Sequence, residues 1–342
     1  MFSFQLNQTM KKILLLPLFF MITHIITAQS KTIGKIERYD AALDKILDKD
    51  TKIEVLGEGF VWSEGPAWVK DGEYLLFSDV PANTIYRWKK GEGVSVFLKP
   101  SGYTGIEPYS DEPGSNGLII NKMGNLVSCE HGDRRLAEMP LKVGGKRTLA
   151  DNYMGKRFNS PNDVVQKSNG DYYFTDPPYG LRLKENDPSR ETTLFGVYRV
   201  DKAGKVTLII EDLTRPNGLA FSPDEKTLYV AQSDPDRAYL MAYPVLKDGK
   251  VGKGKIFYDM TPMVKQGLKG LPDGLKIDKK GNIFTTGPGG VLILSPDAKL
   301  LGRIDTGEAT ANCAFGNDGS MLYITADMYL LRVQTLTVGN GF

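Results

Sequence analysis

The sequence predicts an all-β protein, a six-bladed β-propeller, from three observations. One short pattern recurs six times along the 342 residues. Each copy is dominated by Val, Ile, Tyr, Phe and Thr, the residues that favour strands. Glycine (37 residues) and proline (19 residues) are plentiful enough for many tight turns. Convincing helical periodicity is scarce, and residues 39–47 are the best short helical candidate.

Each copy begins with an acid or an amide, continues through an apolar stretch and a polar turn, and ends in a second strand-like run. The six leading residues are Glu64, Asn116, Asn162, Asn217, Asp273 and Asn312. They lie roughly 50 residues apart, the length of a four-stranded propeller blade. Residues 51–60 are expected to add a strand to the last blade, because closing the ring removes exposed sheet edges. A two-sheet sandwich is the alternative fold, and six copies in phase argue against it.

The N-terminus has the pattern of a secretory signal. Two lysines at 11–12 precede an apolar run over 13–26, and the small residue Ala28 follows. An uncleaved membrane anchor is the alternative, but Pro17 interrupts the run, which is shorter than the ~20 residues that a span requires. We therefore expect an exported protein, periplasmic or secreted, without a membrane span after cleavage near Ala28.

The resulting division is a signal peptide at 1–28, an N-terminal extension at 29–50 and a propeller domain at 51–342. Removing 1–28 leaves equal numbers of basic and acidic residues, so nothing suggests binding to nucleic acid. His131 is then the single histidine, which excludes a classical zinc centre with two or three histidines. Export would permit a disulfide, but we expect the distant Cys129 and Cys313 to be free buried thiols. The sequence gives no indication of the oligomeric state.

The six leading residues predict a metal site. The innermost strand of each propeller blade runs along the central channel, so equivalent positions converge there. All six side chains offer an oxygen, and two carboxylates with four amides carry a formal charge of −2, which matches a divalent cation. Such a set selects hard ions, and Ca²⁺ tolerates a mixed, irregular ring better than Mg²⁺ does. Other divalent cations remain possible, and the alternative is that acids and amides merely begin strands at turns.

Several longer motifs carry a family resemblance. They are SEGPAW at 63–68, EHGDRR at 130–135, NSPNDVV at 159–165, FTDPPYG at 174–180, PNGLAFSPDE at 216–225 and LPDGL at 271–275. Together they resemble bacterial gluconolactonases, which belong to the senescence marker protein (regucalcin) and gluconolactonase family. The resemblance covers roughly residues 50–335. It implies a six-bladed propeller and calcium-dependent hydrolysis of a lactone.

The resemblance also implies roles for individual residues. The metal-binding Glu, Asn and Asp of the family motifs correspond to Glu64, Asn217 and Asp273, and Asn162 is expected as a fourth contact. All four belong to the ring of leading residues. The resemblance further gives Asp273 the role of the base that activates water.

The chemistry of lactone opening leaves the base open. A bound cation would polarise the lactone carbonyl, and a nearby base would take a proton from water. A carboxylate that binds a cation is a poor base, so Asp163 and His131 are alternatives to Asp273. His131 would titrate in the useful range, although a histidine hydrogen-bonded inside a turn is an equally good interpretation.

Three further residues are expected to contact substrate. Asn116 would bind hydroxyls, Arg134 would hold polyol oxygens or a carboxylate, and Tyr179 would line the mouth of the channel. The alternatives are a solvated strand residue for Arg134 and a packed core aromatic for Tyr179. Loops 100–115 and 180–195 are expected to shape the pocket.

The sequence thus predicts an enzyme that hydrolyses a sugar lactone, such as glucono-1,5-lactone. A covalent mechanism is disfavoured, because the sequence has no Gly-x-Ser-x-Gly motif and a single mature histidine. The alternatives are a related metal-dependent esterase or organophosphatase, and a non-catalytic propeller that binds a ligand and is stabilised by calcium.

Overall fold

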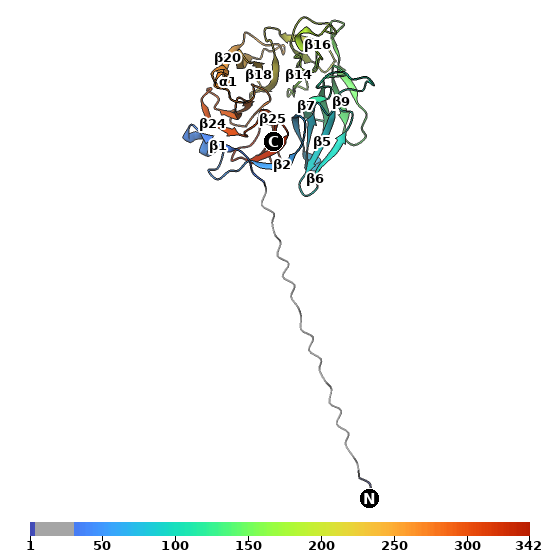
Figure 1. Ribbon diagram of the computed structural model, residues 1–342, viewed down its shortest axis with the longest axis vertical. Coiled ribbons are helices and arrows are strands. Elements are labelled where there is room, and N and C mark those ends of the chain that lie inside the picture. The colour runs from blue at the N-terminus through green and yellow to red at the C-terminus, as the bar shows by residue number, and fades with distance from the viewer. Residues whose placement is uncertain (4–30) are drawn as a thin grey trace. The chain divides into compact units, whose positions relative to one another are not determined.

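The computed structural model describes residues 1–3 and 31–342. The predicted signal peptide falls largely on residues 4–30, outside the described residues. Residues 31–342 form one unit that contains six antiparallel sheets of four or five strands (Figure 1). Within the described part of the chain, no helix is long and apolar enough to cross a membrane. The predicted six-bladed β-propeller is confirmed.

The first three blades follow one another along the chain, each built of four consecutive main strands. Blade 1 contains β3 (Ser63–Val69), β4 (Tyr74–Asp79), β5 (Thr84–Lys89) and β6 (Gly93–Leu98). Blade 2 contains β7 (Ser115–Ile120), β8 (Asn125–Glu130), β9 (Arg135–Pro140) and β10 (Arg147–Ala150). Blade 3 contains β13 (Val164–Gln166), β14 (Tyr172–Thr175), β15 (Val197–Val200) and β16 (Val206–Ile210). A small hairpin of β11 (Asn152–Tyr153) and β12 (Lys156–Arg157) separates blades 2 and 3.

The last three blades repeat this plan, and two of them recruit strands from the N-terminus. Blade 4 contains β17 (Pro216–Phe221), β18 (Thr227–Asp234), β19 (Arg237–Pro244) and β20 (Lys255–Asp259). Blade 5 contains β21 (Leu275–Ile277), β22 (Ile283–Gly287), β23 (Gly290–Leu294), β24 (Leu300–Asp305) and β1 (Lys35–Arg38). Blade 6 contains β25 (Thr310–Gly316), β26 (Met321–Ala326), β27 (Tyr329–Gln334) and β2 (Glu54–Glu58). The short helices are η1 (Ala41–Lys45), η2 (Lys70–Gly72), η3 (Lys184–Asn186) and α1 (Thr261–Lys265).

The ring closes through β2. This strand pairs antiparallel with β27, from Glu54 opposite Arg332 to Glu58 opposite Tyr329. The Arg332 guanidinium donates to the Glu54 carboxylate at 2.6 Å across the same pair. The N-terminal strand therefore covers the outer edge of β27 and supplies the fourth strand of the last blade, as predicted for residues 51–60.

The segment before β2 covers the neighbouring blade as well. Strand β1 pairs antiparallel with β24, and Glu37 of β1 forms an ion pair with Arg303 of β24 at 2.7 Å. The helical candidate at 39–47 contains the short 3₁₀ helix η1, whose start is capped by Asp40 accepting from the Ala42 amide at 2.8 Å. Leu43 and Leu47 are fully buried against blades 5 and 6.

The hydrophobic core consists of six clusters, one at each boundary between neighbouring blades. This division follows from the period of a strand, because alternate side chains point to opposite faces of each sheet. At the boundary between blades 1 and 6, Trp68 stacks on Tyr323 with ring centroids 5.4 Å apart. Apolar burial between blades holds the inner strands in a fixed ring around the channel.

Candidate metal centre

The six leading residues lie at the same end of the channel. Each one is at or just before the beginning of an innermost strand: β3, β7, β13, β17, β21 or β25. These strands are spatial neighbours in a closed circle. Five of the six side chains belong to buried residues, and Asp273 is partly exposed. The convergence that the repeat phase predicted is therefore present in the structure.

Direct contacts join several members of the ring. The Asn162 amide donates to Asn217 Oδ1 at 2.5 Å, and the Asn312 amide lies 3.4 Å from Glu64 Oε2. Burial raises the pKa of Asp273, and the Glu64 carboxylate raises it further. Side chains from blades 1, 3, 4, 5 and 6 thus interact around one axis.

Glycines that follow ring residues allow the inner strands to approach so closely. A Cβ atom at Gly65, which has a left-handed φ of +48°, would lie 2.1 Å from the Asn116 carbonyl oxygen. A Cβ atom at Gly218 would lie 2.3 Å from the carbonyl oxygen of Asp273. No real Cβ approaches an oxygen this closely. The glycine after the ring residue is therefore what lets neighbouring inner strands come so near, and this approach sets the diameter of the ring.

Two aspartates at the ends of second strands hold the chain segments that lead into the ring. In blade 3, the Asp176 carboxylate accepts the backbone N–H groups of Asn159 and Ser160, each at 2.8 Å. In blade 1, Asp79 accepts the corresponding N–H groups of Val61 and Trp62, at 3.1 and 3.2 Å. These hydrogen bonds fix the backbone up to two residues before Asn162 and Glu64 and thereby orient both side chains.

The donor set fits a hard divalent cation. Asn116 Oδ1, Asp163 Oδ2 and Asp273 Oδ1 are buried oxygens without a hydrogen-bond partner among the described residues. Burial also raises the pKa of Glu64, so two close carboxylates lack a compensating charge at the ring. Unpaired buried acceptors and uncompensated acids are costly, and a cation bound through oxygen would relieve both.

The amide oxygens are essential to this fit. Within residues 1–3 and 31–342, no three His, Cys, Asp or Glu side chains group closely enough to bind a metal by themselves. A site at the ring must therefore combine Glu64 and Asp273 with amides, as in the oxygen-rich coordination typical of calcium.

Asp163 directly follows the ring residue Asn162 and is not itself a member of the ring. It is buried, and its Oδ1 accepts the Val164 amide at 2.8 Å. Burial raises its pKa, while the nearby Lys276 ammonium opposes that shift. The Asp163 carboxylate also contributes to raising the pKa of Glu64 and of Asp273, so its charge adds to theirs near the ring.

His131 contacts the side chain of Asn162. Its ring is fully buried, with Nε2 3.2 Å from Asn162 Oδ1 and Nδ1 3.2 Å from the carbonyl oxygen of Glu112. Burial lowers the pKa of His131 to about 4, so the imidazole is neutral at neutral pH. This geometry orients the Asn162 amide.

Glu112, which sequence reasoning missed, lies beside the ring. Its side chain is 31% exposed, and Oε2 is 4.0 Å from His131 Nδ1. Its charge contributes to raising the pKa of both Glu64 and Asp273. The residue lies in the loop between β6 and β7, outside the repeat phase, and its position within predicted pocket loop 100–115 was the one signal available.

The three predicted substrate residues occupy different environments. Asn116 belongs to the ring and has a free buried oxygen. Tyr179 is partly exposed, and its hydroxyl interacts with Ser233, whose Oγ accepts the Asn217 amide at 2.9 Å. Arg134 donates to the carbonyl oxygens of Phe158 and Ser189, at 2.6 and 3.0 Å, and its Nη2 is unpartnered.

The two cysteines are free and buried, in β8 and β25, as expected from their separation. Burial raises the pKa of both thiols. They pack within the core clusters at two different blade boundaries.

Comparisons with known proteins identify the relatives of this chain. Residues 62–327 match the family model described as SMP-30/gluconolactonase/LRE-like region. A gluconolactonase of Zymomonas mobilis is 43% identical over 313 residues, covering 90% of this chain and 88% of the relative. The solved structure of a gluconolactonase from Xanthomonas campestris is 30% identical with a TM-score of 0.76, covering 90% and 99% of the two chains. The calcium-binding protein regucalcin of Agrobacterium tumefaciens shares the fold at 22% identity, with a TM-score of 0.65 and coverage of 84% and 94%.

Proposed function

The chain belongs to the SMP-30/gluconolactonase/LRE-like family, and we propose that it is a lactone hydrolase that opens a sugar lactone of the glucono-1,5-lactone type. The observation that carries this proposal is the ring of oxygen ligands at one end of the channel, in a chain 43% identical to a gluconolactonase. The substrate is a small neutral molecule that must reach this end of the channel.

The proposed cofactor is Ca²⁺, held by Glu64, Asn162, Asn217 and Asp273. When bound, a divalent cation supplies a Lewis acid for the lactone carbonyl. The support comes from the unpartnered oxygen of Asp273, the raised pKa values of Glu64 and Asp273, and the absence of a competing ammonium or guanidinium ion pair at either carboxylate among the described residues.

The residues around these ligands bind and orient. His131 holds the Asn162 amide, and Ser233 holds the Asn217 amide, so two ligand side chains are fixed before substrate arrives. Such preorganisation lowers the entropic cost of reaching the reactive geometry. The Asn116 amide would bind a substrate hydroxyl, Tyr179 would line the mouth of the channel, and Arg134, whose unpartnered Nη2 is buried, would have to move to hold a polar substituent. Asp273, Asp163 and His131 are the base candidates that the sequence indicated.

A hydrolysis assay with and without chelator tests the proposal. The purified protein should open glucono-1,5-lactone above the spontaneous rate, lose that activity in EDTA and regain it with added Ca²⁺. Asp273→Ala should abolish the enzymatic rate, while Asp71→Ala, at an exposed acid on the surface, should match wild type. Wild-type activity of Asp273→Ala would contradict the site. Turnover of aryl esters or phosphotriesters without lactone opening would identify a related hydrolase instead.

The proposed location is outside the cytoplasm. The basic and apolar pattern of residues 1–28 supports export and cleavage near Ala28. N-terminal sequencing of the protein from the extracytoplasmic fraction should begin close to Gln29. An uncleaved N-terminus on a cytoplasmic protein would contradict export.

A further inference from the structure

One carboxylate near the ring, that of Glu112, has no structural role. Glu112 makes no side-chain hydrogen bond and no ion pair with Lys or Arg within residues 31–342. Its Oε2 lies 4.0 Å from His131 Nδ1. A partly buried carboxylate without a hydrogen-bond partner or a basic counter-ion is unfavourable, so its presence beside the ring calls for a chemical explanation.

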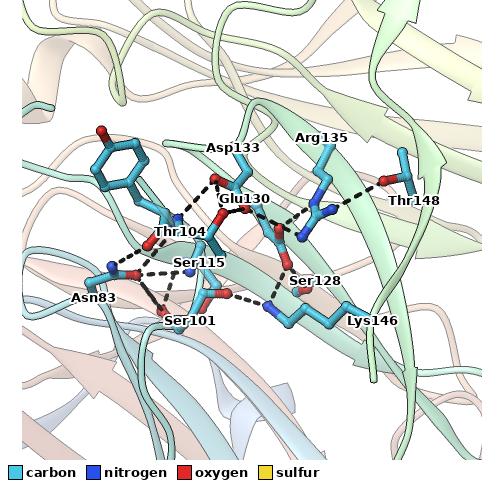
Figure 2. Close-up of polar contacts among 12 residues, drawn as sticks. Asn83, Ser101, Thr104, Ser115, Ser128, Glu130, Asp133, Arg135, Lys146 and Thr148 are labelled. Atoms are coloured by element: carbon cyan, nitrogen blue, oxygen red, sulfur yellow. Dashed lines mark hydrogen bonds and ion pairs between the residues drawn. The ribbon is translucent and has the colours of Figure 1, made fainter. Parts of the chain in front are cut away.

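The first half of the loop that carries Glu112 is fixed by blades 1 and 2. Figure 2 shows the Asn83 side chain against the chain at Ser101, and its Oδ1 accepts the N–H groups of Ser101 and Gly102 at 2.9 and 2.8 Å. The Lys146 ammonium, which pairs with buried Glu130, also contacts the Ser101 carbonyl oxygen (Figure 2). The loop therefore leaves the blade in one defined direction.

The second half of the loop is fixed by the turn at His131. The His131 amide donates to the Gly114 carbonyl oxygen at 3.1 Å, and the Gly132 amide donates to that of Pro113 at 3.0 Å. The Glu112 carbonyl oxygen itself faces His131 Nδ1 at 3.2 Å. The backbone of Glu112 is thus held in place, while its carboxylate stays free of partners and reaches solvent.

The other base candidates are worse placed to accept a proton. Asp273 is a proposed ligand, and a cation stabilises its ionised form, which makes it a weak base. Asp163 is 3% exposed, and its Oδ1 is occupied by a backbone amide. His131 is 0% exposed, and both of its ring nitrogens already face oxygens.

We propose that Glu112 is the general base for lactone opening, an inference that rests on the proposed function. The Glu112 carboxylate takes one proton from water as the water oxygen bonds to the lactone carbonyl carbon. The bond between that carbon and the ring oxygen then breaks, and the ring oxygen receives the proton back from the Glu112 carboxyl group. The products are the hydroxy acid and an enzyme with its carboxylate restored, so water is the single co-reactant.

The charges around Glu112 suit this role. Burial raises the pKa of Glu112, Lys184 opposes the shift, and Asp111 adds to it. The remaining titratable groups that face it are His131, Glu64, Asp273 and Tyr179. A raised pKa brings a carboxylate closer to the operating pH and makes it a stronger base.

The test compares Glu112→Gln with Asp111→Asn, a change at the exposed neighbouring acid. We expect Glu112→Gln to lower kcat by at least about 100-fold with little change in KM, since a positioned base contributes roughly 10²–10⁴-fold. The calcium-induced rise in Tm should be retained, and the acidic limb of the kcat–pH profile should disappear. Added formate should restore part of the activity of Glu112→Ala. Asp111→Asn should keep a wild-type kcat, with at most a small shift of the acidic limb to lower pH, because Asp111 contributes to the raised pKa of Glu112.

The outcomes separate this proposal from the function on which it rests. A kcat of Glu112→Gln within threefold of wild type would overturn the role of Glu112 and leave the lactonase proposal standing. Loss of the calcium-induced Tm shift in Glu112→Gln would assign the residue to metal binding or folding, and would likewise overturn the base role. Absence of lactone hydrolysis by wild type would overturn both proposals.

Discussion

Replacing Gly218 by alanine should widen the ring. The new Cβ atom would lie 2.3 Å from the Asp273 carbonyl oxygen, whereas ordinary contacts are about 3.4 Å or longer, so β17 and the segment before β21 must separate by roughly 1 Å. Overpacking typically costs about 1–3 kcal/mol, and we expect the upper end because backbone, rather than a flexible side chain, is in the way. Metal sites tolerate deviations of about 0.2 Å, so the shift should weaken cation binding strongly.

Thermal and urea unfolding with calcium or EDTA would measure both effects. Wild type should be stabilised by about 2.7 kcal/mol when calcium is present at 100 times its Kd, and Gly218→Ala should lose most of this gain. Gly252→Ala is the matched control, because its Cβ would lie 3.0 Å from a Pro244 side-chain atom, far from the ring. A Gly218→Ala protein with wild-type stability and a wild-type calcium response would refute the argument that close strand approach creates the site.

Three further predictions concern the scaffold. Asp176→Ala leaves two buried backbone donors, the N–H groups of Asn159 and Ser160, without an acceptor, and it removes one hydrogen bond of the Asn159 side chain, which still donates to Leu194. This change should cost about 3 kcal/mol in urea unfolding, more than Asp79→Ala, where two longer bonds near solvent are lost. Hydrogen bonds from Lys35 and Tyr39 lower the pKa of Glu37 to about 2, below its value in the unfolded chain, so the stabilisation by Glu37 should be complete above pH ~5 and fall as pH drops towards 2. Urea unfolding at pH 6 and pH 3 should show that Glu37→Gln removes about 1 kcal/mol of this pH dependence. Cys129 and Cys313 should resist a thiol reagent until the protein unfolds and then react together, whereas rapid labelling of native protein would contradict their burial.

The repeat made the ring predictable from sequence. Six oxygen-bearing residues in phase could be assigned to equivalent blade positions without any knowledge of contacts, and the structure brings them together. The strand over 51–60 was predictable because an unclosed propeller would leave an edge. The aspartates at 79 and 176 end second strands in two repeats, so their positions were visible, but their clamping of the chain before Glu64 and Asn162 depends on geometry.

Features outside the repeat phase could not be predicted in the same way. Strand β1 has the sequence KIER, too short and too charged to show alternation, and it forms because blade 5 offers an edge and Arg303 offers a partner for Glu37. Glu112 lies in an irregular loop whose course is set by Asn83 and by the turn at His131. Such long-range contacts have no local sequence signal, so the motifs alone do not indicate Glu112.

A calcium-binding measurement on the purified protein shows whether the ring is a metal centre. Isothermal titration calorimetry of chelator-treated protein should show one Ca²⁺ per chain, and both Asp273→Asn and Glu64→Gln should abolish or greatly weaken binding, while Asp71→Asn on the surface should not. Wild type that binds no divalent cation, or ring variants that bind it as tightly as wild type does, would contradict a metal centre at the end of the propeller channel.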